Sequence, residues 1–372
     1  MMMTKKRAPG PADSKTPGHA PAAFYAFFLF LLVSPALGSA NTCVTAECHS
    51  GLIAKSTVHE PVAADCLSCH QRKIEEHPAP GGKTFALVAE GAALCASCHE
   101  EKMAHGKYGH DPEVMGNCVK CHDVHSSDQL HLLRQKPQEL CLGCHDEIGE
   151  KMQKAKTRHA PLYRKEACGS CHRIHSGDRE NLLLFTGKEL CLSCHGKDNT
   201  SKSGGLKNIK KELAGKKHLH GPVADGQCSA CHDPHGSAYP RLLTGAYPAG
   251  IYANYEPGIY DFCFGCHDKN LLRSRVTTSG TQFRNGNNNL HYVHSATKLK
   301  GRTCRTCHEP HAGDGDKLIS GEGASFGSWN IPVRFVSMPN GGSCSPGCHQ
   351  TKGYDRVQPV TSAGEKVEGG KE

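Results

Sequence analysis

The sequence predicts a mostly irregular fold with short α-helices and negligible β-structure. Helical periodicity is weak along most of the chain, and no segment alternates apolar and polar residues long enough to indicate a sustained strand. Short helices are expected around the two Glu-Leu-Cys-Leu runs and at residues 207–214. Apolar residues make up 37% of the 372 residues when all 22 cysteines are counted, and about 31% without them, against the usual ~45–50%. Side chains alone would hardly offset the entropy lost on ordering the chain, so the fold needs another source of core.

The cysteines are arranged in a single repeated pattern. All 22 fall into eleven local pairs, and a histidine directly follows the second cysteine of every pair. Nine of these motifs are Cys-x-x-Cys-His, and they comprise Cys66, Cys69 and His70; Cys95, Cys98 and His99; Cys118, Cys121 and His122; Cys141, Cys144 and His145; Cys168, Cys171 and His172; Cys191, Cys194 and His195; Cys228, Cys231 and His232; Cys263, Cys266 and His267; and Cys304, Cys307 and His308. Two are longer variants, formed by Cys43, Cys48 and His49 and by Cys344, Cys348 and His349.

The first 40 residues have the layout of a secretory signal peptide. Lys5, Lys6 and Arg7 precede an apolar run at residues 22–33, and small residues offer a cleavage site after Ala40. The apolar run is short for a membrane span. Export is therefore expected, to the periplasm, the outer membrane or the cell exterior, and an uncleaved N-terminal anchor is the alternative.

The motifs suggest two domains after the signal peptide. Residues 41–199 hold seven motifs and residues 218–350 hold four, and residues 351–372 form a polar tail. Residues 200–217 are rich in lysine and glycine, which favours a linker over a docking patch for an acidic partner. The first motif stands alone. The other ten form five pairs, each with a leading and a trailing motif.

Cys-x-x-Cys-His is the spacing of a covalent haem site. The two thiols lie about one helical turn apart and can add to the two vinyl groups of a porphyrin, and the histidine becomes the proximal iron ligand. The sequence predicts about eleven haem c groups, stacked so that they form the missing core. A disulfide framework needs no histidine after each pair, and zinc ribbons are closed four-ligand sites into which eleven clusters do not divide. Thioredoxin-like pairs occur singly on a βαβ frame that is absent.

The second axial ligand of each iron is expected to be another histidine. Fourteen histidines remain after the signal peptide and the eleven proximal residues are set aside, whereas methionine is scarce. Distal candidates upstream of the leading motifs are His59, His110, His159, His220 and His294; candidates downstream are His77, His125, His175, His235 and His311. Less favoured candidates are His105, His131, His218 and His291. A histidine three residues after a motif cannot easily reach across its own haem, so we expect it to bind a neighbouring one.

Two stretches make the repeat plain and carry a family resemblance. Residues 118–145 and 168–195 are identical at 14 of 28 positions. Together with CSACHDPHGS at residues 228–237, they resemble the doubled Cys-x-x-Cys-His family of multihaem cytochromes c. The chain is also similar to the periplasmic decahaem subunits of outer-membrane electron-transfer conduits, although the eleventh motif, the two longer motifs and the lysine-rich segment depart from them. The resemblance implies closely spaced bis-histidine haems that pass single electrons.

The expected function is therefore electron transfer without catalytic residues. The haems would carry electrons between periplasmic donors and an outer-membrane or extracellular acceptor. Partners would be redox proteins, with a porin-like sheath in the outer membrane or self-assembly into an extracellular filament as two open arrangements. A multihaem reductase acting on nitrite, hydroxylamine or a sulfur oxyanion is the alternative from another class. The net charge of +8 is no argument for nucleic acid, because haem propionates would make the loaded protein acidic.

For the aromatic segment at residues 239–264, which holds five tyrosines, packing against porphyrin faces is favoured over contact with a partner protein.

Overall fold

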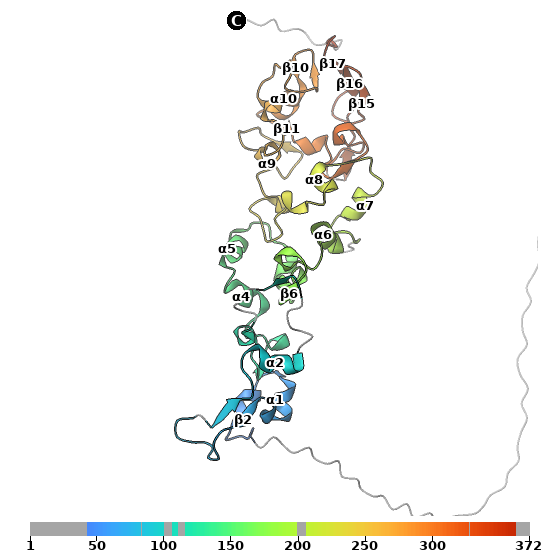
Figure 1. Cartoon of the computed structure of the whole chain (residues 1–372). Coiled ribbons are helices and arrows are strands. Elements are labelled where there is room, and N and C mark those ends of the chain that lie inside the picture. The colour runs from blue at the N-terminus through green and yellow to red at the C-terminus, as the bar shows by residue number, and fades with distance from the viewer. Residues whose placement is uncertain are drawn as a thin grey trace, which may run out of the picture. The chain divides into compact units, whose positions relative to one another are not determined.

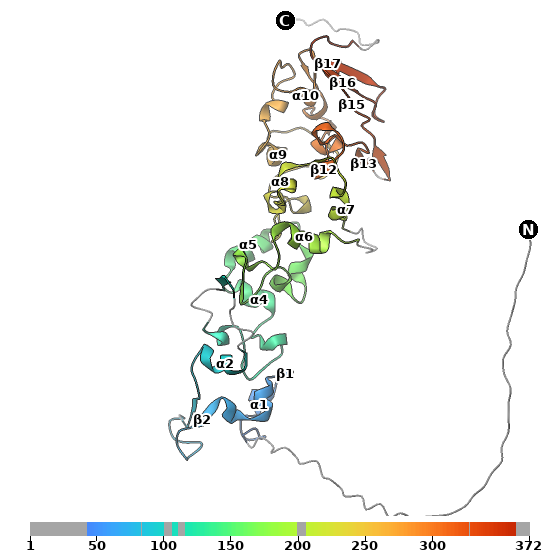
Figure 2. The ribbon, with the colours of Figure 1, turned by 45° about the vertical axis from the view of Figure 1, so that its right-hand side comes forward.

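The computed structural model describes residues 43–82, 84–99, 106–110, 116–198, 206–326 and 328–361. Cys43–Glu372 forms one compact unit, and the predicted signal peptide lies outside the described residues. Within the unit, elements succeed one another in nearly the order of the chain, from α1 and β2 at one end to β17 at the other (Figures 1 and 2). The predicted fold class is confirmed, because helices and strands are short and most of the chain is irregular.

Among the described residues, the α-helices are four to nine residues long. They are α1 Glu60–Ala64, α2 Ala92–His99, α4 Pro137–Leu142, α5 Asp146–Lys154, α6 Gly187–His195, α7 Ile209–Leu213, α8 Gly221–Ala224, α9 Asp261–Phe264 and α10 Leu290–Ser295. Helices α4 and α6 confirm the prediction for the Glu-Leu-Cys-Leu runs, and α7 confirms that for residues 207–214. In the described part of the chain, no helix is both long and apolar enough to cross a membrane.

Short antiparallel strand pairs connect segments that are far apart in the sequence. They are β1 Thr57–Val58 with β5 Ser126–Ser127, β4 Tyr108–Gly109 with β6 Ser176–Gly177, β7 His218–Leu219 with β12 Ala312–Gly313, and β8 Tyr252–Ala253 with β11 Gly301–Arg302. In the first three of these, a strand just before one motif pair joins the strand just after the leading motif of the next pair. A single β-bridge between Thr157 and Ser237 makes the same connection between the third motif pair and the fourth.

The other strands are local. They are the hairpins β2 His70–Arg72 with β3 Phe85–Leu87, β9 Arg284–Asn285 with β10 Asn288–Asn289, and β13 Ala324–Phe326 with β14 Trp329–Ile331. A three-stranded sheet near the C-terminus comprises β15 Val336–Met338, β16 Gly341–Cys344 and β17 Lys352–Asp355.

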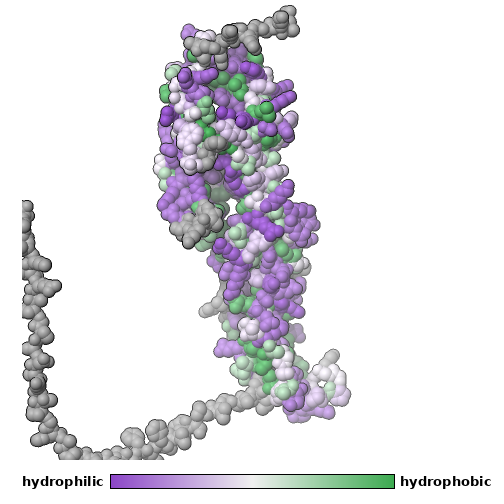
Figure 3. Space-filling model, turned by 180° about the vertical axis from the view of Figure 1, so that it is seen from behind, coloured by the Kyte–Doolittle hydropathy of each residue, from purple (hydrophilic) through white to green (hydrophobic). Residues whose placement is uncertain are grey.

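The protein core is small. Among the described residues, only eleven apolar side chains are buried, and four of them, Leu243, Tyr247, Tyr260 and Leu272, form one cluster. Three of these, Leu243, Tyr247 and Tyr260, belong to the aromatic segment predicted to pack on porphyrin faces, and the cluster also contacts Cys263 and Cys304. In the space-filling view, hydrophilic residues dominate and apolar residues are scattered between them (Figure 3). The structure thus agrees with a chain that needs more than its own side chains to form a core.

A tight loop follows the leading motifs of pairs two to five. In the second pair, His131 and Leu132 both have positive φ, which turns the chain back so that Leu133 bridges to the proximal His122. The same loop recurs at Asn181 and Leu182, at Arg241 and Leu242, and at Lys317 and Leu318. The Leu-Leu repeat of the sequence is therefore the signature of a turn.

Candidate haem-binding sites

Leading and trailing motifs have different local structure. The leading motifs begin on single 3₁₀ turns, such as Cys118–Lys120 and Cys228–Ala230. The first four trailing motifs lie on or next to helices: α2 and α6 each contain a whole motif, α4 ends just before Cys144, and α9 contains Cys263. The fifth begins at Cys344, the last residue of β16. In both types, the backbone N–H of the proximal histidine donates to the carbonyl of the first cysteine, as from His122 to Cys118 (3.0 Å) and from His145 to Cys141 (3.1 Å). This turn keeps both thiols and the imidazole within one local unit.

The histidine rings gather in pairs, and each pair joins a proximal histidine to one of the other predicted ligands. Ten such pairs have ring centroids 5.9–6.4 Å apart. They are His49 with His77, His59 with His99, His70 with His125, His110 with His145, His122 with His175, His159 with His195, His172 with His235, His220 with His267, His232 with His311, and His291 with His308.

The separation fits one iron between two imidazoles. With about 2.0 Å for an imidazole nitrogen–metal bond and about 1.2 Å from that nitrogen to the ring centre, two axial imidazoles would have centroids about 6.4 Å apart. The observed separations lie within 0.5 Å of this value. Eight pairs have ring planes within 20° of parallel, and the pairs His122–His175 and His232–His311 are tilted by 39° and 45°. The residues present therefore fit a bis-histidine haem.

A simple rule describes the pairing. The histidine upstream of a motif pair lies opposite the trailing proximal histidine of that same pair, as His110 does for His145. The histidine three residues after a leading motif lies opposite the leading proximal histidine of the preceding pair, as His175 does for His122. The strand pairs described above hold the two kinds of histidine together: the backbone N–H of His110 donates to the carbonyl of His175 (2.9 Å).

The ends of the chain depart from this rule. At the start, His77 lies opposite His49 of the isolated first motif. At the end, no later pair follows His308, and His291 on α10 takes the place of a downstream histidine. His294, also on α10, lies near His349: burial lowers the pKa of His294, and the charge of His349 contributes to this. Of the less favoured candidates, His291 alone is placed opposite a proximal histidine among the described residues.

Two of the remaining three less favoured candidates have other surroundings. His131 is in the tight loop of the second pair, where its carbonyl accepts a hydrogen bond from His122. His218 is in β7, with its Nε2 3.8 Å from Asp316. His105 lies outside the described residues.

Backbone carbonyls orient many of these imidazoles. Proximal His122, His172, His232 and His308 each hydrogen-bond through Nδ1 to the carbonyl nine residues later, at 2.7–2.9 Å. A carbonyl oxygen can only accept, so Nδ1 carries the proton and Nε2 keeps the lone pair that an iron ligand requires. Sequence reasoning missed these acceptors, although the repeated Leu-Leu turn marks three of the four positions.

Burial keeps several of the imidazoles in the neutral form that binds metal. It lowers the pKa of His125, His175, His195, His220, His232, His235 and His308, and it lowers that of His291 to about 4. Desolvation of the charged ring is the largest cause in each case.

One imidazole has a different partner. Nδ1 of His311 lies 3.2 Å from Oε1 of Glu212 on α7, and Lys207 holds the other carboxylate oxygen at 3.0 Å. Burial acts to raise the pKa of Glu212, but the contacts with His311 and Lys207 outweigh it and lower the pKa to about 2. The carboxylate of Glu212 thus lies between an imidazole and a lysine ammonium group. In the sequence, this lysine-rich segment resembles a linker, and no local pattern marks Glu212.

Cysteines of consecutive motifs are neighbours from the first motif to the eleventh. The thiols of Cys141 and Cys168 are close neighbours, as are those of Cys263 and Cys304. Other thiols of successive motifs lie near enough to interact electrostatically: Cys43 with Cys66, Cys69 with Cys95, Cys95 with Cys118, Cys121 with Cys144, Cys171 with Cys194, Cys191 with Cys228, Cys231 with Cys266, and Cys307 with Cys344. Every motif therefore adjoins the motifs before and after it in the sequence. All 22 cysteines are described, and none of them forms a disulfide.

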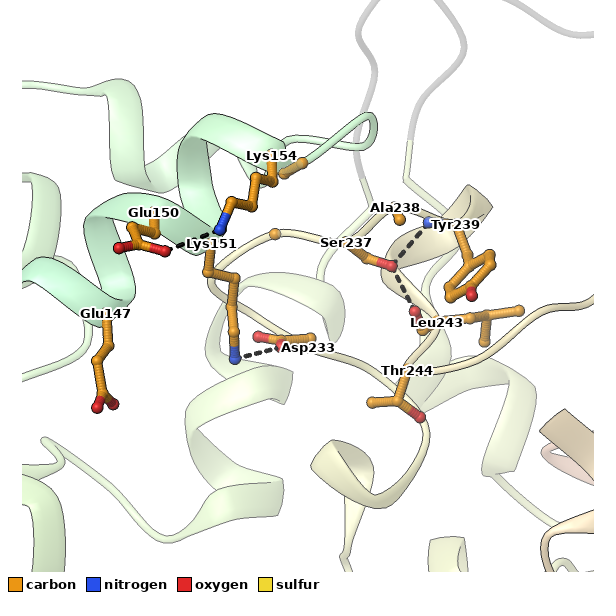
Figure 4. Close-up of a pocket in the computed structure, with 12 residues that line it drawn as sticks. Glu147, Glu150, Lys151, Lys154, Asp233, Ser237, Ala238, Tyr239, Leu243 and Thr244 are labelled. Carbon is orange, nitrogen blue, oxygen red and sulfur yellow. Dashed lines mark hydrogen bonds and ion pairs between the residues drawn. The ribbon is translucent and has the colours of Figure 1, made fainter.

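Polar contacts also connect the second motif pair with the fourth, past the pair between them in the sequence. Lys151 on α5, just after the trailing motif of the second pair, binds Asp233 at 2.8 Å (Figure 4). Asp233 also accepts the backbone N–H of His235 at 3.0 Å. Ser237 donates to the carbonyl of Leu243 and accepts the N–H of Tyr239. These residues line an open cavity of about 490 Å³ between α5 and the loop of the fourth pair. One of the side chains that line it, Asp233, thus also helps to position His235.

Comparison with known proteins identifies the repeated motif. Four segments match the family described as the doubled CXXCH motif, at residues 59–104, 110–150, 159–200 and 220–271. Each begins at the upstream histidine of one of the first four motif pairs and contains both of its motifs. No curated protein matches the chain. The matched motifs indicate covalently bound haem c.

Proposed function

We propose that this chain, whose doubled motifs are those of an electron-transferring multihaem c-type cytochrome, carries eleven bis-histidine haems in sequence order and conducts electrons along them. Haem c supplies one-electron Fe(III)/Fe(II) chemistry when bound. The ten histidine pairs are the observation that carries the proposal, because their separations fit two axial ligands of one iron. In each site, two cysteines would hold the porphyrin and the paired histidines would be the iron ligands. For the eleventh site, the pair would be His294 and His349.

The order of the sites is supported by the cysteine contacts. Because thiols of consecutive motifs adjoin from Cys43 to Cys344, porphyrins attached to them would follow one another in single file. Electron transfer needs such proximity, and a file without branches would give one route from end to end. The interlocked histidines would keep neighbouring sites at a fixed spacing, since each leading site takes its second ligand from the following pair.

A second imidazole opposite the proximal one is the ligand set of an electron carrier. A reductase of nitrite, hydroxylamine or a sulfur oxyanion needs an iron with one position open to substrate. The pairing therefore favours the carrier. The signal-like leader supports export, and we propose periplasmic redox proteins as donors and an outer-membrane or extracellular acceptor, reached through a porin-like sheath or as part of a filament.

Haem content and spin state test the central claim. A pyridine-haemochrome assay on the purified chain should give about eleven haems per polypeptide, and the ferric protein should be low-spin throughout by EPR. The double variant Cys118→Ala, Cys121→Ala should lose one haem. Far fewer than eleven haems, or several high-spin irons in the wild type, would contradict the proposal.

Cell fractionation tests the location separately. Protection from protease in intact cells together with release in the periplasmic fraction would support a periplasmic carrier. Co-purification with an outer-membrane protein would support a conduit, and fibres in the extracellular fraction by electron microscopy would support a filament. Recovery only in the cytoplasm would refute export.

A further inference from the structure

The carboxylate of Glu212 contacts one predicted iron ligand directly. Its Oε1 lies 3.2 Å from Nδ1 of His311, and its side chain is only 9% exposed. His311 lies opposite His232, so the contact belongs to the site of Cys228 and Cys231, the eighth in the file. Glu212 and His311 are 99 residues apart in the sequence, so only the folded chain brings them together.

The segment that carries Glu212 is held in place at several points. Asn208 caps α7 by accepting the N–H of Lys211 at 3.0 Å. Asp198, just after α6, binds both Asn208 (3.0 Å) and Lys211 (2.6 Å). On the other side, His311 is fixed by its carbonyl, which accepts the N–H of His220 at 3.0 Å. Carboxylate and imidazole are thus positioned by separate sets of contacts.

No other histidine pair of the described residues has a carboxylate at this distance from a ring nitrogen. His59, His159 and His294 bind carbonyl oxygens through Nδ1, as the proximal histidines do, and His291 contacts a threonine hydroxyl. The equivalent histidine of the preceding pair, His235, has Asp233 nearby, but its Nδ1 lies 3.9 Å from that carboxylate, beyond hydrogen-bond distance.

We propose that Glu212 is a positioning residue that lowers the reduction potential of the eighth site. Its charged carboxylate would accept a hydrogen bond from the Nδ1–H group of His311. A charged acceptor makes a stronger hydrogen bond than a carbonyl and makes the imidazole a more basic ligand. A more basic ligand stabilises Fe(III) relative to Fe(II). The reduction takes up one electron, and the proton stays on Nδ1. The proposal rests on the proposed function, because it concerns the haem-loaded chain.

As a consequence, electron transfer from the seventh site to the eighth would be unfavourable in free energy. An electron that reaches the seventh site from the N-terminal side would meet a neighbour with a lowered potential before it continues to the last sites. Replacing the carboxylate with a neutral acceptor weakens one charge-assisted hydrogen bond. This is expected to change the equilibrium constant for reduction of the eighth site about tenfold. For one electron, tenfold is about 59 mV.

Two substitutions with opposite expected signs test this proposal. Glu212→Gln should raise the reduction potential of one of the eleven sites by about 59 mV, which is a tenfold change in its one-electron equilibrium constant. Optical redox titration would measure this shift. Lys207→Gln leaves the carboxylate but removes its competing partner, so it should lower the potential of the same site. Lys207 is 69% exposed, and this variant is expected to fold even if Glu212→Gln does not.

The matched controls are Glu150→Gln and Lys154→Gln. Glu150 and Lys154 form an ion pair of 2.8 Å on α5 and are 67% and 75% exposed. Their substitutions change the net charge by the same amounts as the test variants, at positions that contact no histidine pair. If the haem content is full but the potential shifts are no larger than in the controls, the proposed role of Glu212 is wrong, whereas the proposed function stands. A low haem content in the wild type would instead refute the proposed function.

Discussion

His291 lies opposite His308, with ring centroids 6.4 Å apart and ring planes 19° from parallel. His308 belongs to the leading motif of the last pair, for which no later pair can supply a downstream histidine. Helix α10 supplies His291 instead, and the nearby His294 on the same helix is left for His349. One helix thus carries both the partner of His308 and the histidine that we propose for His349, and the repeating rule of the chain ends there.

Substituting His291 with alanine should leave the iron of the Cys304–Cys307 site with one axial ligand. One of eleven ferric haems should become high-spin by EPR, and one reduced haem should bind CO. His131→Ala is the control, because His131 lies opposite no other imidazole and contributes only its carbonyl. A fully low-spin His291→Ala protein would show that another residue binds this iron.

Substituting His125 should alter the haem site of the preceding motif pair and leave the site of its own motif unchanged. Its ring lies opposite His70 of the preceding pair, at 6.3 Å, although its own motif ends at His122. His125→Ala should therefore create one high-spin haem at Cys66 and Cys69. When these two cysteines are also replaced with alanine, the high-spin signal should disappear together with that haem. Persistence of the signal would mean that His125 serves a different iron.

The buried hydroxyl of Ser237 should matter for stability. Ser237→Ala would leave the Leu243 carbonyl and the Tyr239 N–H without this partner, and Ser237 and Leu243 are each 8% exposed. Leaving such buried groups unpaired costs about 1–3 kcal/mol. Chemical denaturation of the haem-loaded protein should show the loss. Ser325→Ala, at an exposed hydroxyl bound to Asn330, should change stability by less than about 0.5 kcal/mol.

Lys317 offers a stabilising substitution. It has φ 57° and ψ 26°, a left-handed conformation that costs an ordinary residue about 1–2 kcal/mol and that asparagine adopts more readily. The equivalent loop of the third pair already has Asn181 there. Lys317→Asn should raise the denaturation midpoint, whereas Lys298→Asn, outside the positive-φ positions, should not. An unchanged midpoint for both would argue against strain at Lys317.

The chain should not fold without its haems. Only eleven apolar side chains are buried among the described residues, too few to offset the ordering entropy of the unit. Expression without the haem-attachment machinery should give a protease-sensitive chain with little secondary structure by circular dichroism. A cooperative unfolding transition in the haem-free protein would refute the view that porphyrins form the core.

The sequence by itself determined the chemistry of the sites. Paired cysteines followed by histidine can be recognised from residues that are adjacent in the chain, and so can the short helices around the Glu-Leu-Cys-Leu runs. The scarcity of apolar residues and of regular periodicity was enough to predict an irregular fold. The count of remaining histidines also showed that a second imidazole for each iron was available.

Only the tertiary structure decided which histidines meet. His125 and His70 are separated by a whole trailing motif, and their approach depends on β1 and β5, strands of two residues that carry no recognisable pattern. His291 was one of four equal candidates until α10 placed it beside His308. Glu212 lies in a lysine-rich stretch that resembles a linker, and its contact with His311 exists because Asp198 and Asn208 fold that stretch back. These relationships come from long-range backbone pairing, which residue type and local spacing do not encode.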